Sequence, residues 1–369
     1  MSLGSVALVT SNLSAGGAQG VCVTVANALA SRGYQVSLVC LNLNDSFRLD
    51  EVSGNVDVID LRSMRSRWAI WPLLRFLRTA SPEVVVSFSL PLFMYSAFLR
   101  MISLWSGGLA VRSINTPSAV LQHRTGFARH SVIEPLARRF YCQADAVIAQ
   151  TDVMATDLRR RYGLLPEKVH TIYNPVSSRI SEKATQFNVQ PPERPLSARY
   201  LLFAGRLDYQ KNLEGLLQAF ELFHRSVPDT VLVLAGAGPY EDRLREKAVA
   251  TGLAEHVQFV GYQADLAPWY WHAEATVLAS HYEGLPNVLI ESIALGTPVV
   301  AFDSPGGTGD VVLPGENGFL VPYPDVEAFA DALVQLVETR PFEREQAMAA
   351  AQRFDRERIV DQYEQVLRS

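Results

Sequence analysis

Two glutamates in residues 280–300 (SHYEGLPNVLIESIALGTPVV) are spaced for chemistry on a hydroxylated ligand. Glu283 precedes a predicted helix that Gly284 and Pro286 open, and Glu291 follows about two turns along it. Carboxylates accept hydrogen bonds from hydroxyl groups, so two of them beside one helix start suit a sugar. The structural alternative is a capped helix with two solvated glutamates.

The start of this predicted helix also favours an anion, because backbone N–H groups there lack intrahelical partners and carry partial positive charge. The N–H groups concerned are those of Leu285, Asn287 and Val288. The segment therefore suits a ligand that carries both negative charge and hydroxyl groups.

A second loop, AGRLDYQKN at residues 204–212, carries Arg206 and Lys211 between a predicted strand and a predicted helix. Open α/β sheets bind ligands at the carboxyl ends of their strands. Arginine offers phosphate a planar fork of donors, and lysine offers it a mobile point charge. Two solvated loop cations are the structural alternative.

Glycine-rich turns follow two more predicted strands. SAGGAQ, with Gly16 and Gly17, opens the first helix and lets the backbone approach a phosphate, although it is not a GxGxxG fingerprint. A plain tight turn is equally consistent with it. LAGAGP, residues 234–239, is expected to serve mainly as a structural turn, with Pro239 at the first helical position.

The elements that must position these loops alternate between apolar strand runs and helical patterns, which is typical of parallel sheets in α/β proteins. Strands are expected at Val6–Thr10, Gln35–Cys40, Val56–Ile59, Val84–Phe88, Leu109–Ser113, Ala146–Ala149 and Val169–Tyr173, and then at Tyr200–Ala204, Val231–Ala235, Val257–Val260, Ala275–Ala279 and Pro298–Phe302. The predicted fold is α/β with two Rossmann-like domains facing across a cleft.

The polar, proline-rich stretch between the two series predicts the division into domains. We expect an N-terminal domain at 1–175 completed by an amphipathic C-terminal helix at 355–369, a linker at 176–198 and a C-terminal domain at 199–354. The net charge of −5 divides unequally, since residues 1–190 hold 19 Lys and Arg against 12 Asp and Glu. Residues 191–369 carry a net charge of −12. The total of −5 argues against a dedicated nucleic-acid binder, which is usually basic.

Composition excludes several other classes. With 48% hydrophobic and 19% charged residues the 369-residue chain is not disordered. Cys22, Cys40 and Cys142 form no CxxC pair and suit a reducing cytosol. The apolar stretch Leu90–Trp105 contains Arg100 and is too short to span a membrane, and the N-terminus resembles a strand more than a signal peptide.

The order of these motifs, together with GENGFLVP and a last helix FDRERIVDQYEQVL, resembles the family 4 retaining glycosyltransferases of the GT-B fold over nearly the whole chain. The resemblance implies transfer from a nucleoside-diphosphate sugar, with UDP-sugar favoured, to a glycan or lipid-linked acceptor in surface polysaccharide assembly. It implies no cofactor, because the nucleotide sugar is a substrate. No Asp-x-Asp occurs, so a metal-bridged donor is not expected.

The resemblance also implies roles. Arg206 and Lys211 would hold the diphosphate, Glu283 would contact the donor sugar, and Glu291 would bind the ribose hydroxyls. Backbone contacts with the donor would come from Gly16, Gly17, Gly261 and Gly284–Val288, a run that includes Leu285, Pro286 and Asn287.

Two departures from the family pattern stand out. Gln19 occupies a position where relatives often carry Glu, and the run VVVSFS at residues 84–89 lacks a histidine that many relatives have. His123 is a candidate acceptor or donor-sugar contact, although a surface histidine is the commoner outcome.

Residues 62–78 mix arginines with Trp68 and Trp71, which fits either an interfacial segment on anionic lipid or an ordinary helix with solvated arginines. We therefore expect a cytoplasmic protein with candidate peripheral attachment at the inner face of the plasma membrane. Two rival functions remain open. One is a GT-B-type nucleotide-sugar epimerase, and the other is a non-catalytic nucleotide-sugar-binding protein.

Overall fold

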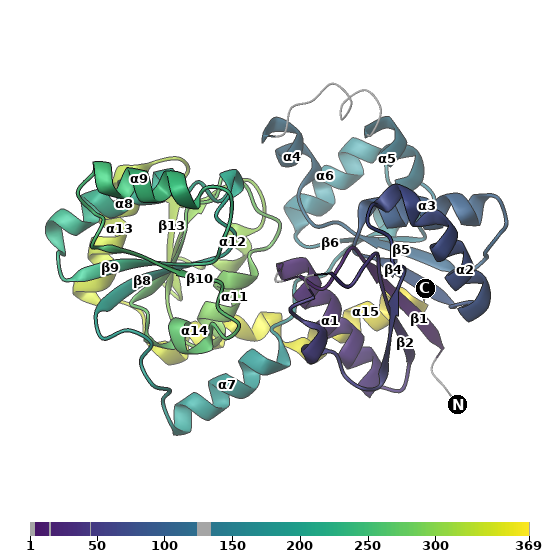
Figure 1. The fold of residues 1–369 in the computed structure, drawn as a ribbon, viewed down its shortest axis with the longest axis horizontal. Coiled ribbons are helices and arrows are strands. Elements are labelled where there is room, and N and C mark those ends of the chain that lie inside the picture. Colours follow the sequence, from purple (N-terminus) through teal and green to yellow (C-terminus); the bar gives the residue numbers. More distant parts are fainter. Residues whose placement is uncertain (1–3, 15, 45, 124–133, 369) are drawn as a thin grey trace. The chain divides into compact units, whose positions relative to one another are not determined.

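The computed structural model describes residues 4–14, 16–44, 46–123 and 134–368. The chain divides into two compact units, which are Met1–Ser177 with Arg356–Ser369, and Ser178–Asp355. Each unit is a parallel β-sheet with helices on both of its faces (Figure 1). The predicted α/β class with two Rossmann-like units is thereby confirmed.

The first unit contains a seven-stranded sheet in the order β3-β2-β1-β4-β5-β6-β7. Its strands are β1 (Ser5–Thr10), β2 (Gln35–Cys40), β3 (Val56–Asp60), β4 (Val84–Ser87), β5 (Gly108–Arg112), β6 (Ala146–Ala149) and β7 (Val169–Thr171). Val6 aligns with Val36 of β2 on one side and with Val84 of β4 on the other. The strand order therefore reverses between β1 and β4.

Two hydrophobic cores lie on the two faces of this sheet, because successive strand residues point to opposite faces. Leu8 faces helices α1 (Gly17–Ser31) and α15 (Arg356–Arg368). Its neighbour Val9 faces α2, α3, α5 and α6. The helices of that second face and the short α4 are bounded at Ile70–Ala80 (α2), Leu90–Met101 (α3), Pro117–His123 (α4), Glu134–Tyr141 (α5) and Asp152–Tyr162 (α6).

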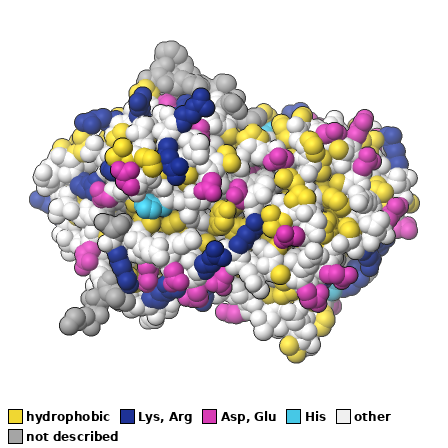
Figure 2. Space-filling view, turned by 180° about the vertical axis from the view of Figure 1, so that it is seen from behind, with side chains coloured by type: hydrophobic (Ala, Val, Ile, Leu, Met, Phe, Trp, Pro, Cys, Tyr) yellow, Lys and Arg dark blue, Asp and Glu magenta, His cyan; other side chains and the backbone are white. Residues whose placement is uncertain are grey.

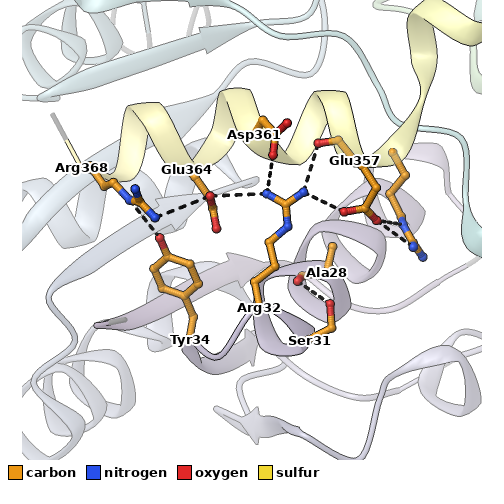
Figure 3. Close-up of polar contacts among 9 residues, drawn as sticks. Ala28, Ser31, Arg32, Tyr34, Glu357, Asp361, Glu364 and Arg368 are labelled. Atoms are coloured by element: carbon orange, nitrogen blue, oxygen red, sulfur yellow. Dashed lines mark hydrogen bonds and ion pairs between the residues drawn. The ribbon is translucent and has the colours of Figure 1, made fainter. Parts of the chain in front are cut away.

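The C-terminal helix α15 packs on α1, as the sequence predicts. It buries Ile359, Val360, Tyr363 and Val366. At the edge of this contact, the Arg32 guanidinium donates to Glu357 and Asp361, both at 2.7 Å, and lies 3.4 Å from Glu364 (Figure 3). A helix distant in sequence thus completes the first unit through an apolar face and one arginine.

The second unit contains a six-stranded parallel sheet in the order β10-β9-β8-β11-β12-β13. Its strands are β8 (Arg199–Ala204), β9 (Thr230–Ala235), β10 (Val257–Gly261), β11 (Ala275–Leu278), β12 (Val299–Asp303) and β13 (Gly318–Pro322). The order reverses between β8 and β11, which pair through Ala275 with Leu201 and Thr276 with Leu202.

Helices cover this sheet in two groups (Figure 1). The helix α8 packs against α9 and α13, while α11 packs against α7, α10 and α14. Their bounds, with those of the short α12, are Ser178–Val189 (α7), Leu213–Ser226 (α8), Glu241–Ala250 (α9), Ala267–His272 (α10), Asn287–Ala294 (α11), Thr308–Val311 (α12), Val326–Thr339 (α13) and Arg344–Ala351 (α14).

Helix α7 lies inside residues 176–198, which the sequence predicts as linker. It buries Ile180, Ala184 and Phe187, and the Phe187 ring meets Trp271 edge to face with centroids 5.4 Å apart. Its polar composition hides this apolar stripe at helical spacing. The strand β13 is also absent from the sequence prediction, because its five residues begin with Gly318 and end with Pro322, which are uncommon in strands.

Among the residues that the structure describes, no helix is both long enough and apolar enough to cross a membrane.

Candidate functional site

Two loops leave the same edge of the second sheet where its strand order reverses. One follows β8 and contains residues 205–212, and the other follows β11 and contains residues 279–286. Loops on either side of such a reversal diverge and leave a crevice at the carboxyl ends of the strands, which is where parallel α/β sheets bind ligands. The fold therefore brings the two most informative sequence motifs to one place.

An ion pair joins these loops. The Lys211 ammonium donates to Glu283 Oε1 at 2.6 Å, and Ser280 Oγ donates to the same oxygen at 2.6 Å. The Lys211 side chain is 17% exposed and that of Glu283 is 8% exposed. A carboxylate with so little access to water needs a cation and hydrogen-bond donors, and Lys211 and Ser280 supply both.

Backbone and amide contacts fix the register of the pair. The His281 N–H donates to the Gln210 carbonyl at 2.8 Å, and Gln210 Nε2 donates to the Tyr282 carbonyl at 3.0 Å. Next along the chain, Asn212 Nδ2 donates to the Ala279 carbonyl at 3.0 Å. These contacts alternate along the two loops, so the positions of Lys211 and Glu283 depend on one another.

The second cation of the site, Arg206, is more accessible. Its guanidinium forms an ion pair with Asp208, and its side chain is 69% exposed. The Asp208 side chain is only 14% exposed, and its Oδ1 is buried without a hydrogen-bond partner. Both predicted cations are thus paired with carboxylates in the absence of a ligand.

Two glycines allow the backbone packing beneath this site. A Cβ on Gly236, whose φ is +153°, would lie 1.8 Å from the Gly205 carbonyl oxygen. One on Gly306, at φ +134°, would lie 2.1 Å from the Glu283 carbonyl oxygen. The glycines after β9 and β12 therefore let neighbouring loops pack directly on the cationic loop and on Glu283. This agrees with the expected structural role of LAGAGP.

Glu291 lies on the helix α11, which begins at Asn287 after Pro286. Its Oε2 accepts a hydrogen bond from the hydroxyl of the buried Tyr270 at 3.1 Å. The helix start brings partial positive charge to the Glu283 side of the site, while Tyr270 orients the second carboxylate from α10.

An aromatic cluster borders the same loops. The Tyr209 ring packs on His281 with centroids 4.7 Å apart, and His281 Nδ1 lies 2.7 Å from the Tyr323 hydroxyl. Burial raises the pKa of Tyr323 above its ordinary value, so this phenol stays protonated at neutral pH. Tyr209 is half exposed and offers a flat apolar surface beside Lys211.

The remaining predicted residues take several positions. Gly284 and Leu285 are buried in the turn before α11, and Val288 is in its first turn. Gly261 ends β10 at φ +67°. In the first unit, Gly16 precedes α1 and Gly17 begins it. His123 ends α4, but its side chain falls outside the part of the chain that the structure describes.

Sequence reasoning missed four of the polar contacts. Ser280 and Asp208 lie inside the recognised motifs, and their closeness to Glu283 and Arg206 in sequence was an available signal. Gln210 also lies inside its motif, but the sequence assigns it no role. Tyr270 carries no such signal, because only the tertiary packing of α10 on α11 brings it to Glu291.

Elsewhere in the second unit, a cavity of about 360 Å³ lies at the opposite, amino edge of the sheet. Its lining includes Trp271, Phe342 and Arg344 and none of the predicted site residues. Within the described part of the chain, no group of three or more His, Cys, Asp or Glu side chains is arranged to hold a metal ion.

Taken together, Arg206, Lys211 and the start of α11 form a cationic edge, and Glu283 and Glu291 add hydrogen-bond acceptors to it. Such a combination can bind a ligand that carries phosphate and hydroxyl groups.

Two family models match the chain. The model described as Glycosyl transferases group 1 matches residues 185–353, and the one described as Glycosyltransferase Family 4 matches residues 15–179. The chain is 24% identical over 341 residues to the amylovoran biosynthesis glycosyltransferase AmsD of Erwinia amylovora, covering 91% of each. It is 35% identical over 182 residues to the lipopolysaccharide core biosynthesis glycosyltransferase LpsE of Rhizobium meliloti, which is 48% of this chain and 52% of LpsE.

Among solved structures, Anabaena HepE in complex with UDP and glucose superposes with a TM-score of 0.79 at 19% identity and covers 99% of both chains. At that identity the likeness concerns the fold.

Proposed function

The chain belongs to the family 4 glycosyltransferases, and on that premise we propose that it transfers a sugar from a nucleoside-diphosphate sugar to a glycan or lipid-linked acceptor. The observation that carries the proposal is the Lys211–Glu283 pair between the β8 and β11 loops, with Arg206 on the same loop as Lys211. A UDP-sugar is the proposed donor, because HepE is seen with UDP and glucose.

In the proposed reaction the sugar–phosphate bond breaks, and negative charge grows on the leaving diphosphate. Arg206 and Lys211 neutralise that charge, and the start of α11 adds its partial positive charge. Without a ligand these cations are paired with Glu283 and Asp208, so the diphosphate takes over both cations when the donor binds. Because cationic side chains neutralise the leaving diphosphate and the sequence has no Asp-x-Asp, we propose that the transfer needs no metal ion.

The carboxylates act on the hydroxylated parts of the donor. Glu283 accepts hydrogen bonds from the donor sugar, and Glu291 accepts them from the ribose. The backbone of residues 284–288 contacts phosphate and sugar, and the backbone of Gly261 contacts the base. The acceptor attacks from the face that the diphosphate leaves, so the anomeric configuration is retained without a protein-bound intermediate.

The process that this reaction serves is proposed from the relatives. AmsD and LpsE are named for amylovoran and lipopolysaccharide core biosynthesis, so we place this chain in surface polysaccharide assembly. Such assembly starts from sugars made in the cytoplasm and uses lipid-linked acceptors, so we propose a cytoplasmic enzyme that attaches peripherally to the inner face of the plasma membrane.

Two measurements test the function. A panel of nucleotide sugars is screened for thermal stabilisation of the protein, since a bound ligand raises stability with its concentration over Kd. The stabilising donor is then supplied with candidate acceptors, and the linkage formed is assigned by NMR. We expect a UDP-sugar to stabilise the protein and an α-linked donor to give an α-linked product. An epimerised donor without transfer would instead support the epimerase.

Substitutions then locate the chemistry. Glu283→Ala and Lys211→Ala should abolish transfer while the circular dichroism spectrum stays that of the folded protein. Lys247→Ala is the matched control, because Lys247 is also partly buried, contacts Glu214 and belongs to α9, which holds none of the predicted site residues. Near-normal turnover in either site variant would overturn the assignment.

A further inference from the structure

One stretch of the first unit is strongly cationic and contains no acidic residue. Between Asp60 and Glu83, residues 61–82 contain five arginines, which are Arg62, Arg65, Arg67, Arg75 and Arg78. All five are exposed, and among the described residues none of them makes an ion pair. The nearest acidic residue in sequence, Asp60, accepts a hydrogen bond from the backbone N–H of Arg62. The guanidinium groups therefore face solvent without counter-charges.

Large apolar side chains stand among these arginines. Met64 is 77% exposed, Trp68 is 63% exposed and Trp71 is 74% exposed. Tryptophan is normally well buried in a soluble protein. Three large, exposed apolar side chains within eight residues form a patch that usually marks an interaction surface. The Arg67 guanidinium lies 5.5 Å from the Trp68 ring centre, so the two kinds of side chain are interleaved.

The helix α2 turns this surface outward. It buries Leu73, Leu74, Phe76 and Leu77 in the core of the first unit. Trp71, Arg75 and Arg78 follow one another at spacings of four and three, so they share the opposite, solvent face. The alternative of an ordinary packed helix with solvated arginines does not explain this outer face, because the face also carries an exposed tryptophan.

The surface also has a defined place on the sheet. Residues 61–69 follow β3 directly, and α2 begins at Ile70, so Met64, Trp68 and Trp71 lie at the carboxyl edge of the parallel sheet. The glycine turn before α1 follows β1 at the same edge. Figure 2 shows acidic and basic side chains mixed over one face of the molecule. By sequence, residues 61–82 differ from this, because they contain basic residues and no acidic ones.

We propose that Met64, Trp68 and Trp71, with the five arginines around them, form a surface that docks on an anionic lipid bilayer. Tryptophan and methionine insert at the boundary between headgroups and acyl chains, and the arginines contact anionic headgroups. A soluble polyanion would satisfy the arginines but would leave the three apolar side chains in water. The inference deepens the proposed function and rests on it for its purpose, because a lipid-linked acceptor lies in such a bilayer.

The experiment uses the full chain and vesicles of phosphatidylcholine with or without phosphatidylglycerol. We expect flotation with the anionic vesicles and quenching of tryptophan fluorescence by brominated acyl chains. Trp68→Ser/Trp71→Ser should lower the binding constant at least about tenfold and remove most of the quenching. Arg65→Gln/Arg67→Gln/Arg75→Gln should lower binding to a similar extent and reduce its dependence on salt.

Matched controls come from the second unit. Arg225→Gln/Arg243→Gln/Arg245→Gln removes the same charge from exposed arginines, and Val249→Ser removes an exposed apolar side chain. Both should bind vesicles as the unchanged protein does. All the substituted side chains are largely exposed, so thermal unfolding should show that each variant remains folded.

Absence of binding to anionic vesicles would overturn the inference, as would equal binding of the tryptophan variant and the unchanged protein. Binding of heparin equal to that of vesicles, with no fluorescence quenching, would identify a polyanion surface and also overturn it. Sugar transfer to a water-soluble acceptor is assayed without vesicles. If the unchanged protein transfers sugar but does not bind anionic vesicles, the docking surface alone is refuted. If it binds these vesicles through the two tryptophans but transfers no sugar, the proposed function alone is refuted.

Discussion

Replacing Lys211 with methionine separates its two roles, one in stability and one in chemistry. The substitution keeps the length of the side chain and removes the charge, so it leaves the Glu283 carboxylate, 8% exposed, with the Ser280 hydroxyl as a remaining partner. Breaking a fully buried pair costs about 3–5 kcal/mol. Because the Lys211 side chain is 17% exposed and the pair is not fully buried, we expect a loss at or just below the lower limit, about 2–3 kcal/mol.

The stability part is reversible by a second substitution. Glu283→Gln removes the uncompensated charge, so Lys211→Met/Glu283→Gln should regain about 1–2 kcal/mol of the loss. Chemical denaturation of all four proteins gives the cycle, and in a scan the single variant should melt about 4–12 °C lower.

The catalytic part is not reversible in this way. Loss of a cation that stabilises the leaving diphosphate should lower kcat about 10²- to 10³-fold, and the double variant should be no faster. Lys247→Met, whose Nζ lies 4.0 Å from Glu214 Oε2, is the matched control and should stay active and lose at most about 1 kcal/mol. Recovery of transfer in the double variant, or an unchanged stability in Lys211→Met, would refute the reasoning.

Three further substitutions or probes test other contacts. Asp208→Asn should tighten UDP binding about two- to fivefold by calorimetry, because Asp208 competes with phosphate for the exposed Arg206; unchanged affinity would argue against competition. Arg32→Ala should cost about 1–2 kcal/mol near neutral pH. The bond from Arg32 lowers the pKa of Glu357 below 4.5, so this stability exists above that value and is lost as pH falls through the lowered one. Denaturation curves that differ equally at low pH would contradict this origin. Of the three cysteines Cys142 alone is exposed, so native maleimide labelling followed by peptide mass spectrometry should find one fast thiol.

Most of the fold was predictable because the strands are buried on both faces and appear as uninterrupted apolar runs. The predicted strands Gln35–Cys40 and Ala146–Ala149 match β2 and β6 at both ends. The helix α7 escaped prediction because only Ile180, Ala184 and Phe187 form its apolar stripe amid polar residues and nearby prolines. A stripe of that width is defined only by what it packs against.

The site was predictable as a set of residues but not as a set of contacts. Lys211 and Glu283 are separated by 72 positions, and nothing in the spacing says that the loops after β8 and β11 run side by side. That follows from the strand order, which reverses between β8 and β11, and the order depends on the whole sheet. The role of Gln210 as a bridge between the loops follows from the same register.

The carboxylate partners of Lys211 and Arg206 indicate which ligand the site binds. A site for phosphate alone would gain from unpaired cations, yet Lys211 is held by Glu283 and Arg206 by Asp208. When a diphosphate takes over the cations, the buried Glu283 needs a new donor in place of the ammonium. The hydroxyl groups of a sugar attached to that diphosphate supply one, and inorganic phosphate or a free nucleotide does not supply it there. We therefore infer that the Glu283–Lys211 pair selects for the intact nucleotide sugar over the free nucleotide.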